Sequence, residues 1–550
     1  MKKTLLFAFL LLFQFSFSKP ITETQKLAAT CKVWGFLKYY HPNVTDGSKN
    51  WDEQLFQILP KVEEAKTSEA FSLVIENWID SLGEIKKQES LKSAVKKEYF
   101  DKNFDLSWSN NKELFSKSLS KKLKFIEENR IQEKQYYVAY EFGSNGPPLQ
   151  FKNEVKYADF KWTDKNLRLL ALFRYWNYIE YFFPYKYQMD QNWDKVLNEM
   201  LPRYYAPESE KDFNLAMREI SVKLNDTHAS TSMPQLFEYF GDKFIPVDVT
   251  IIDEKAIVVA LKNDSLAKVS DIKIGDVITK VEGKTIAEIL NENRKYVEGS
   301  NEPSVLRNVY WAIFNGKTPS FEIEYIRDGK TSIKSINRYE YEDLKIQFPD
   351  KEKWKILEGN IGYVDFNELD PADVPALISA LNNTNAIIFD NRNRPHEVMY
   401  PIVDWLNPEE KEFARFLDPD VNYPGRYYWR EEIQKCGKSN PDHYKGKVIV
   451  ITNEKAVSHA EFTVMSLQTV PNCVVIGSQT GGADGANYRF QIIKGFGSSF
   501  TCYGVFYPNK KETQRIGIVP NIEVKPSVLG IQQGRDEVLE RAVLFAKKGK

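Results

Sequence analysis

A repeated aromatic pattern constrains the first half of the chain more than any other feature. Trp34-Gly-Phe-Leu-Lys-Tyr-Tyr-His-Pro42 returns 142 residues later as Trp176-Asn-Tyr-Ile-Glu-Tyr-Phe-Phe-Pro184. The same ungapped register maps Trp51-Asp52 onto Trp193-Asp194 and Leu59-Pro60 onto Leu201-Pro202. Self-similarity at one fixed offset is the signature of a duplicated structural unit. Residues 19–85 are therefore predicted to be the first copy and residues 161–236 the second.

The two copies are predicted to be helical, and they end differently. Leu55, Ile58, Leu59 and Val62 recur at the spacing of one helix face. The first copy ends Leu82-Gly-Glu-Ile-Lys86, whereas the second ends Leu224-Asn-Asp-Thr-His228. Only the second copy carries a titratable imidazole there. We expect the first copy to be scaffold and the second to serve a site as well, although His228 could also be a plain surface residue after a helix end.

The first 18 residues have the pattern of a secretory signal peptide. Lys2 and Lys3 precede an apolar run from Leu5 to Phe15, and Ser16-Phe17-Ser18 offers small residues for cleavage. The run is too short to cross a bilayer, which takes about 20 apolar residues. The chain is therefore expected to be exported, to the periplasm or to the cell surface and medium, with no transmembrane segment after cleavage.

Charge and cysteine content exclude several classes of function. The 550 residues carry a formal charge of −1 and no long basic block, so nucleic acid is not an expected partner. Four cysteines in a chain of this length are too few for a disulfide scaffold, and buried thiols are favoured. Their spacing matches no metal-binding motif, and no cofactor is expected.

Between the copies, residues 86–160 are expected to form a helix, one or two short strands and a turn. Residues 237–340 change character: Phe244–Ile252 and Ala256–Leu261 have strand patterns with turn residues between them. Ile272-Lys-Ile-Gly-Asp-Val-Ile-Thr-Lys-Val-Glu-Gly-Lys-Thr-Ile286 follows. This stretch resembles a PDZ domain, which implies a groove that binds an extended peptide as an added strand. A generic small β-domain is the alternative.

Residues 341–550 alternate strand and helix patterns, as α/β crossover units do. Expected strands are 361–366, 386–390, 447–452 and 473–477; expected helices are 371–382, 396–405 and 459–469, with an amphipathic helix closing the chain. Ser458 falls at the turn from strand 447–452 into the next helix. A serine there can project its hydroxyl, and the unpaired N–H of His459 can stabilise an oxyanion. On this segment alone, Ser458 could equally be a helix N-cap.

Three short motifs carry a family resemblance. They are Ser458-His-Ala-Glu461, Val475-Ile-Gly-Ser-Gln-Thr-Gly-Gly482 and Gly517-Ile-Val-Pro-Asn-Ile-Glu-Val524, in this order and after the PDZ-like stretch. Together they resemble the tail-specific (carboxyl-terminal processing) and tricorn-like serine peptidases, and the whole arrangement looks most like exported Bacteroidetes members. The resemblance implies a multidomain α+β and α/β protein with a ClpP/crotonase-like α/β peptidase core, and Ser458 as its nucleophile.

The resemblance also implies how the serine is activated. Some relatives use a lysine about 25 residues after the serine, but Ala483 stands there. The tricorn-like solution takes a histidine from a D-S-H context before the PDZ domain, and Asp226-Thr227-His228 matches it. His228 would be the general base, and Thr227 would take the place of the serine that orients it. Gln514 lies nearest the position of the family's steering glutamate, with Glu512 two residues away.

The oxyanion loop departs from the family pattern. Asp390-Asn-Arg-Asn-Arg-Pro395 replaces a loop that is glycine-rich in relatives, and Pro395 has no N–H to donate. Arg394 or His396 would have to supply that donor beside His459. Among the other histidines, His459 is badly oriented toward the Ser458 hydroxyl, His41 is expected to pack in the first copy, and His396 and His443 remain alternative bases.

Together these features predict an exported serine endopeptidase that cleaves unfolded or C-terminal segments of proteins through an acyl-enzyme. A catalytically degenerate peptide-binding protein on the same fold is the alternative, motivated by the altered loop and by Gln514. An esterase that uses the same serine is a third reading.

Overall fold

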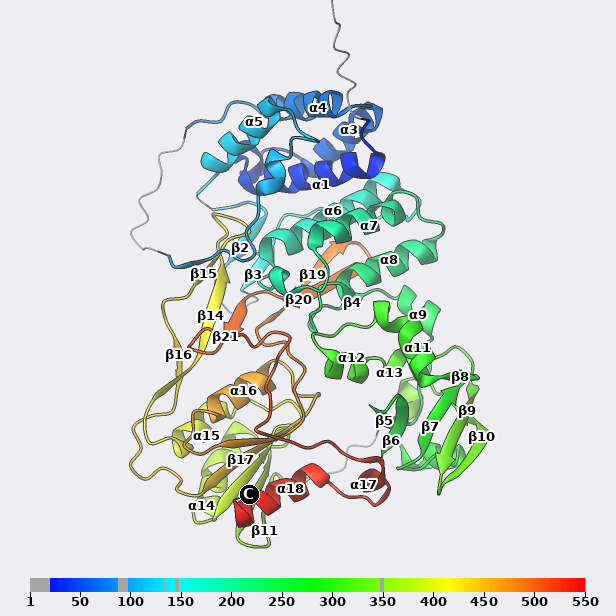
Figure 1. Cartoon of the computed structure of the whole chain (residues 1–550), viewed down its shortest axis with the longest axis vertical. Coiled ribbons are helices and arrows are strands. Elements are labelled where there is room, and N and C mark those ends of the chain that lie inside the picture. The colour runs from blue at the N-terminus through cyan, green and yellow to red at the C-terminus, as the bar shows by residue number, and fades with distance from the viewer. Residues whose placement is uncertain (1–19, 88–96, 133, 144–147, 347–350, 550) are drawn as a thin grey trace, which may run out of the picture. The chain divides into compact units, whose positions relative to one another are not determined.

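The computed structural model describes residues 20–87, 97–132, 134–143, 148–346 and 351–549. The predicted signal peptide lies outside the described residues. The chain divides into two compact units, one of Met1–Leu91 with Asp105–Gln132 and one of Lys92–Phe104 with Glu133–Lys550. Each is described by itself below (Figure 1). No helix in the described ranges combines the length and the apolar character that a membrane crossing requires.

The first unit is helical. Its helices are α1 (Glu23–Tyr40), α2 (Pro42–Thr45), α3 (Trp51–Glu64), α4 (Ser68–Ser81), the 3-10 turn η1 (Ser107–Asn110) and α5 (Lys117–Glu128). Side-chain caps start most of them, as when Thr22 accepts from the N–H of Gln25 at the start of α1. Helix α1 is buried on nearly all sides, which is why its sequence shows no apolar stripe.

The second unit begins its helical part with α6 (Lys165–Phe182), α7 (Trp193–Tyr205) and α8 (Glu210–Val222). Each helix starts 142 residues after α1, α3 or α4. Both segments contain the same pair of tryptophans. The indole N–H of Trp176 donates to Trp193 O and that of Trp193 to Trp176 O, both at 3.0 Å. Trp34 and Trp51 make the same reciprocal bonds at 3.2 and 3.1 Å.

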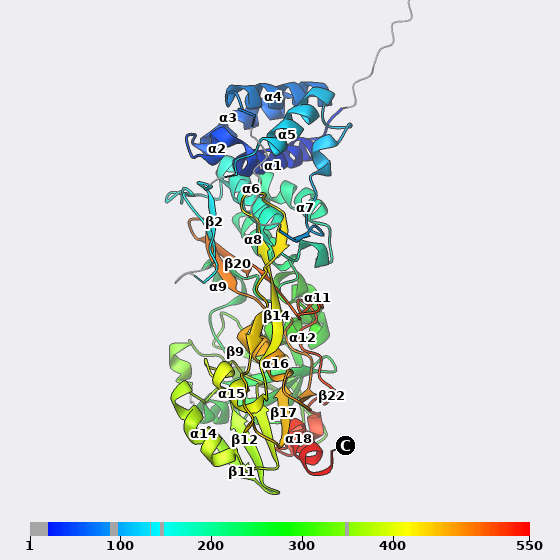
Figure 2. The ribbon, with the colours of Figure 1, turned by 90° about the vertical axis from the view of Figure 1, so that its left-hand side faces the viewer.

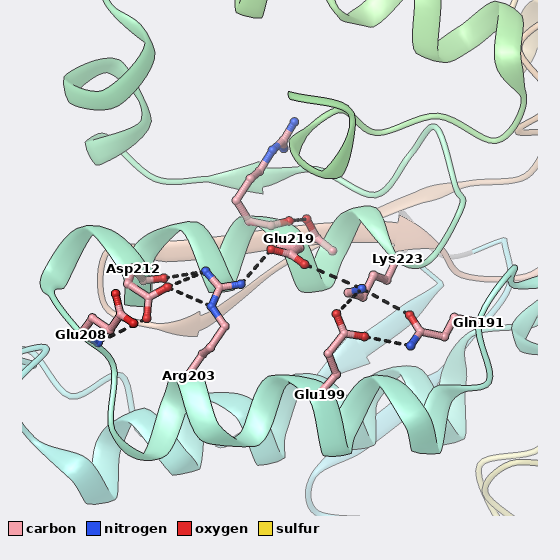
Figure 3. Close-up of polar contacts among 9 residues, drawn as sticks. Gln191, Glu199, Arg203, Glu208, Asp212, Glu219 and Lys223 are labelled. Carbon is pink, nitrogen blue, oxygen red and sulfur yellow. Dashed lines mark hydrogen bonds and ion pairs between the residues drawn. The ribbon is translucent and has the colours of Figure 1, made fainter. Parts of the chain in front are cut away.

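A polar network joins α7 to α8 (Figure 3). The guanidinium of Arg203 binds Asp212 at 2.7 Å and Glu219 at 2.7 Å. One turn farther on, the ammonium of Lys223 binds Glu199 at 2.9 Å. These side chains lie between the two helices and hold α8 against α7.

A β-module follows α9 (Gln235–Phe240). Its antiparallel sheet has the order β10-β9-β7-β6-β5, with β8 beside β7. The strands are β5 (Val247–Ile252), β6 (Lys255–Leu261), β7 (Val277–Val281), β8 (Lys284–Thr285), β9 (Ser320–Arg327) and β10 (Lys330–Asn337). Five short helical segments accompany it: α10 (Asp264–Val269), α11 (Ile286–Asn293), η3 (Arg294–Tyr296), α12 (Glu302–Asn308) and α13 (Tyr310–Phe314).

The turn between β7 and β8 shows how the sequence builds this module. Glu282 and Gly283 have φ of 48° and 78°, the left-handed pair that a two-residue hairpin of the primed kind requires. Farther on come η4 (Glu342–Leu344) and the α/β core.

The core is built on a six-stranded sheet of order β11-β12-β13-β17-β18-β22. Its strands are β11 (Trp354–Leu357), β12 (Ile361–Asp365), β13 (Ala386–Asp390), β17 (Lys447–Thr452), β18 (Val474–Gly477) and β22 (Ile522–Glu523). All neighbours from β12 onward run parallel, and β11 is antiparallel. This is the mixed α/β architecture expected of residues 341–550.

Helices cover both faces of that sheet (Figure 2). The 3-10 turn η5 (Pro371–Asp373) leads into α14 (Val374–Leu381), which joins α15 (Met399–Leu406) and α16 (His459–Leu467) over one apolar face. Helix α18 (Glu537–Lys548) packs on the other, following α17 (Val528–Gln532). Burial on both faces explains why these strands read as continuous apolar runs.

Smaller sheets connect the core to the second helical segment. One contains β1 (Tyr99–Phe100), β14 (Lys411–Pro419), β15 (Tyr427–Trp429), β16 (Gln434–Cys436) and β21 (Gly504–Phe506). Another has the order β19-β20-β4, from Asn487–Ile493, Phe496–Thr501 and Thr231–Ser232. The pair β2 (Val138–Tyr140) and β3 (Leu149–Phe151) and the turn η2 (Lys186–Gln188) complete the unit.

The pairing of β4 with β20 positions the candidate site. Ser498 lies opposite Thr231 and Gly497 opposite Ser232. The chain that follows α8 therefore lies on the hairpin that follows the glycine-rich loop. In the part of the chain that the structure describes, Cys436, Cys473 and Cys502 are free thiols, and Cys31, Cys436 and Cys502 are buried.

Candidate active site

Ser458 sits in a strained turn between β17 and α16. Its φ of 58° and ψ of −119° place a non-glycine residue in the left-handed half of the map. Such strain costs about 1–3 kcal/mol and persists where the surroundings enforce it, as in the nucleophile turns of hydrolases. The hydroxyl donates to the carbonyl of Gly485 at 3.4 Å. The turn therefore holds the hydroxyl out toward the loop before β19.

Glu461 ties this turn to the glycine-rich loop. Its carboxylate accepts from the N–H of Ser458 at 3.1 Å and from those of Gly482 and Ala483 at 2.8 and 3.0 Å. The Thr480 hydroxyl adds a bond of 2.5 Å. Burial raises the pKa of Glu461, and these hydrogen bonds oppose that rise. The glutamate of the Ser-His-Ala-Glu motif is thus the anchor that sets the position of the serine backbone.

A hydrogen-bond chain through Thr501 to Asp226 orients the ring of His228. Its Nδ1 lies 2.9 Å from the Oγ of Thr501, and that hydroxyl donates to Asp226 Oδ1 at 3.0 Å. Because the threonine proton goes to the carboxylate, the threonine oxygen is left to accept from Nδ1–H. The neutral ring then carries its proton on Nδ1, and Nε2 is the basic nitrogen.

Asp226 is the buried carboxylate behind this chain. Besides the Thr501 hydroxyl, it accepts from the N–H of Thr501 at 2.8 Å and from the N–H of His228 at 3.1 Å. The side-chain amide of Gln514 donates to it at 3.1 Å. Asp226 and Gln514 are each 1% exposed, so this charge is compensated by hydrogen bonds within the protein.

The surroundings favour the neutral form of His228. Burial lowers the pKa of the imidazole most. The cations Arg394 and Arg307 lower this pKa further, whereas the negative charge of Asp226 raises it. The imidazole is therefore unprotonated at neutral pH, as a general base must be.

Gly485 is the point where the serine and the histidine chain meet. Its carbonyl accepts from the Ser458 hydroxyl, and a Cβ added to it would lie 2.9 Å from Cγ2 of Thr501. Thr501 is in turn bonded to the imidazole of His228. Residues 230 positions apart in the chain are thus linked to the same glycine, Ser458 directly and His228 through Thr501. Within the described residues, the Ser458 hydroxyl donates to the carbonyl of Gly485 and not to the imidazole of His228.

Two other predicted residues lie elsewhere in the unit. The Thr227 hydroxyl lies 3.0 Å from both Ser300 Oγ and Gly481 O, so it joins the β-module to the glycine-rich loop. Glu512 accepts from the Tyr187 hydroxyl and the Gln188 amide, both at 2.9 Å. Gln514 does enter the histidine network, but through Asp226.

Asp226 belongs to the predicted Asp226-Thr227-His228 motif but has no predicted role there, and no sequence pattern indicates Thr501. The threonine lies 273 positions from His228, in an ordinary strand pattern. No local spacing marks it, because the contact is created by the pairing of β4 with β20.

The predicted oxyanion donors are the backbone N–H groups of His459, which follows Ser458, and of Arg394 in the loop after β13. Within the described residues, the backbone N–H groups of His459 and Arg394 have no acceptor. The carbonyl of His396 accepts from the ring of His459 at 3.3 Å, so the 390–396 loop reaches the start of α16. Pro395 is buried in that loop.

The remaining histidines have their own partners. His396 contacts Asp370 at 2.7 Å, and His443 contacts the carbonyl of Asn440 at 3.0 Å. His41 belongs to the first unit, where its Nδ1 accepts from the N–H of Asn43. Ala483, at the position of the lysine used by some relatives, is fully buried.

Comparison with known proteins places the core. Residues 360–524 match the model of peptidase family S41. The structure of mature CPAF complexed with lactacystin aligns with a TM-score of 0.54 at 14% identity, over 70% of this chain and 100% of that chain. The photosystem II D1 C-terminal processing protease aligns at 16% identity over 68% and 98%, with a TM-score of 0.41. No curated protein sequence matches the chain. Residues 360–524 are therefore a peptidase domain similar to peptidase family S41.

Proposed function

We propose that this chain is an exported serine endopeptidase that cuts unfolded or C-terminal segments of proteins through an acyl-enzyme on Ser458. One observation carries the proposal. A serine in a strained strand-to-helix turn contacts Gly485, and a neutral, oriented histidine is linked to the same glycine through Thr501. Nucleophilic catalysis by a serine needs those two groups and a donor for the oxyanion.

In the proposed reaction, Nε2 of His228 takes the proton of Ser458 as the hydroxyl attacks the peptide carbonyl. The developing oxyanion is stabilised by the free N–H groups of His459 and Arg394. The imidazolium then gives its proton to the leaving amine, and water releases the acyl group by the reverse sequence. Thr501 and Asp226 keep the proton of the resting ring on Nδ1, and Asp226 favours the imidazolium that forms.

The serine must turn before it reacts. Its hydroxyl donates to Gly485 O at 3.4 Å, which is a weak bond at the limit of hydrogen-bond geometry. Rotation about χ1 costs little for an unbranched serine side chain. We propose that substrate binding shifts the hydroxyl from this carbonyl to the imidazole of His228.

We also propose that the β-module of residues 237–340 is a PDZ-like domain that presents the substrate. Its antiparallel sheet with a packed α11 supports this assignment, and β5 is an edge strand to which an extended peptide could add. The 142-residue spacing of the helices and the repeated tryptophan bridge support a duplication of the helical segments. Export, to the periplasm or beyond, rests on the sequence of residues 1–18.

The test compares Ser458→Ala and His228→Ala with the wild type, on casein and on a chemically unfolded protein. We expect wild-type cleavage and labelling of Ser458 by a fluorophosphonate, and loss of cleavage in both variants. Equal turnover by all three proteins would contradict the assignment. Peptide binding without labelling or cleavage would favour the degenerate binding protein, and activity on short acyl esters alone would favour an esterase.

A further inference from the structure

Two arginines from different parts of the chain flank the nucleophile turn. Arg307, in α12 of the β-module, donates from Nη1 to the carbonyls of Glu454 and Lys455 at 3.1 and 3.5 Å. These carbonyls lie four and three positions before Ser458. Arg394 lies in the loop after β13, two positions before His396, whose carbonyl contacts the ring of His459. Arg307 thus binds the segment before Ser458, and the loop that carries Arg394 contacts the start of α16.

Neither guanidinium has an ion-pair partner in the part of the chain that the structure describes. Arg394 is exposed, whereas burial lowers the pKa of Arg307 despite carboxylates in its vicinity. Both charges act on His228, where they lower the pKa of the imidazole. The partly buried charge of Arg307 is costly unless an anion compensates it, whereas the exposed charge of Arg394 is free to bind one.

The nearby carboxylates are engaged elsewhere. Glu298 pairs with Arg218, and Glu461 is buried under four hydrogen bonds from the serine turn and the glycine-rich loop. Glu454 accepts from the Ser478 hydroxyl at 3.2 Å. On the side of Arg394, Glu397 lies 3.7 Å from the ring of His459. A compensating anion for the two arginines is therefore expected to come from the substrate.

We propose that Arg394 and Arg307 select substrates that carry a carboxylate close to the scissile bond. The inference rests on the proposed function, since it names the substrate class of that same site. Guanidinium groups bind carboxylates through charge-assisted and often bidentate hydrogen bonds, which fix the orientation of a planar group. The carboxylate could be an Asp or Glu side chain or the free end of a peptide, because the chemistry is the same.

The first test uses pairs of short fluorogenic peptides of one scaffold. In one series of pairs the end is amidated, and Asp or its Asn counterpart is walked through the positions on either side of the scissile bond. A further pair lacks acidic side chains and ends in a free carboxylate or an amide. We expect the wild type to prefer the carboxylate member of at least one pair about tenfold in kcat/KM, mainly through KM. The pair that shows the preference identifies the source of the carboxylate, and the preference should shrink as salt is raised.

Variants decide whether the arginines cause the preference. Arg394→Gln and Arg307→Gln should each reduce the ratio within the preferred pair to about twofold, whereas Arg394→Lys and Arg307→Lys should keep most of it. Arg489→Gln removes an exposed arginine of β19 and is the matched control, for which the ratio should stay unchanged. A ratio near one in the wild type, or one that survives both glutamine variants, would overturn the proposal.

Binding separates this proposal from the proposed function. The same peptides are measured by fluorescence anisotropy on Ser458→Ala, which binds but does not turn over. Tighter binding of the carboxylate member, lost with Arg394→Gln in that background, would support selection even if no peptide were cleaved by the wild type. Equal binding of both members, together with Ser458-dependent cleavage, would refute the selection and leave the peptidase assignment standing.

Discussion

The two helical segments, residues 23–82 and 165–224, have the same helix spacing and the same tryptophan pair, but they differ at their ends. Both have an 18-residue first helix, and both join it to the next through reciprocal tryptophan bonds. After the third helix they part. The first continues as Gly83-Glu-Ile-Lys86, and the second as Asn225-Asp-Thr-His228. The tryptophan pair is thus the same in both, whereas the sequences diverge in the few positions after the last helix.

Histidines mark the difference most clearly. The first segment buries His41 where the second has Phe183, and the second carries His228 where the first has Lys86. Both histidines have a pKa below the ordinary value because they are buried. Only His228 has a carboxylate and a hydroxyl that leave Nε2 as the base, so the setting of a histidine matters more than its burial.

The largest expected effect follows from exchanging these histidines for residues without a base. His228→Ala should lower kcat by about 10⁴-fold or more, as loss of a general base does in serine peptidases. His41→Phe copies the residue of the second segment and should leave kcat within about twofold. Steady-state kinetics on casein-derived peptides measure both. Comparable losses in the two variants would mean that the segments do not differ in the way described.

The tryptophan bridges test whether the shared core is equally important in both segments. Trp34→Ala and Trp176→Ala should each lower the free energy of unfolding of their own unit by about 4 kcal/mol, because each leaves a cavity and removes an indole hydrogen bond to one carbonyl. The two bridges belong to separate compact units. In urea titrations followed by residual activity, the midpoint should therefore fall for Trp176→Ala and not for Trp34→Ala.

The acceptor chain behind His228 should matter less than the histidine itself. Thr501→Val removes the hydroxyl between Nδ1 and Asp226 at nearly constant volume, so the ring loses its preferred tautomer and orientation. We expect kcat to fall about 100-fold, with KM little changed. Thr501→Ser keeps the hydroxyl and should restore most of the rate. A merely structural threonine would lower stability in both variants without this difference in kcat.

The same residues show how much of the fold and of the candidate site can be predicted from the sequence. The buried strands of the core and the turn that bears Ser458 were predictable, because apolar runs and turn residues are local signals. His228 was found because the two segments could be aligned and one of them had gained an imidazole. Thr501 could not be found in this way, since its contact depends on the pairing of β4 with β20. Strand β14 was not predicted either, since Glu412, Arg415 and Asp418 interrupt its apolar pattern.

The role of Glu512 shows a second limit. Its carboxylate lies near the expected position in sequence, yet it binds Tyr187 and Gln188, while Gln514 reaches Asp226. In an irregular segment, neighbours one or two positions apart point in different directions, and sequence alignment does not resolve which of them turns inward. Motif spacing therefore locates the segment, and the fold chooses the residue.

A smaller effect is expected on the pH dependence of the stability of the first unit. Burial, aided by Lys49, lowers the pKa of His41 to about 4 from 6.5. As pH falls below 6.5, the unfolded chain takes up a proton that the folded unit does not, so the free energy of unfolding should fall. The expected loss is about 2 kcal/mol between pH 7 and pH 5. It should be absent in His41→Phe, and urea unfolding of the two proteins at several pH values measures it.

The polar network between α7 and α8 should give the smallest effect. Arg203 is half-buried and binds the carboxylates of Asp212 and Glu219. Its counterpart in the first segment is Lys61, and there the positions of the two carboxylates are occupied by Ala70 and Asn77. Arg203→Leu should therefore cost about 1 kcal/mol of unfolding free energy, and Lys61→Leu nearly nothing. Because α8 leads directly to Asp226, the Arg203 variant should also lower kcat slightly, which Lys61→Leu should not. A loss of stability without any change in kcat would show that the network holds the helices together but does not help to place the histidine.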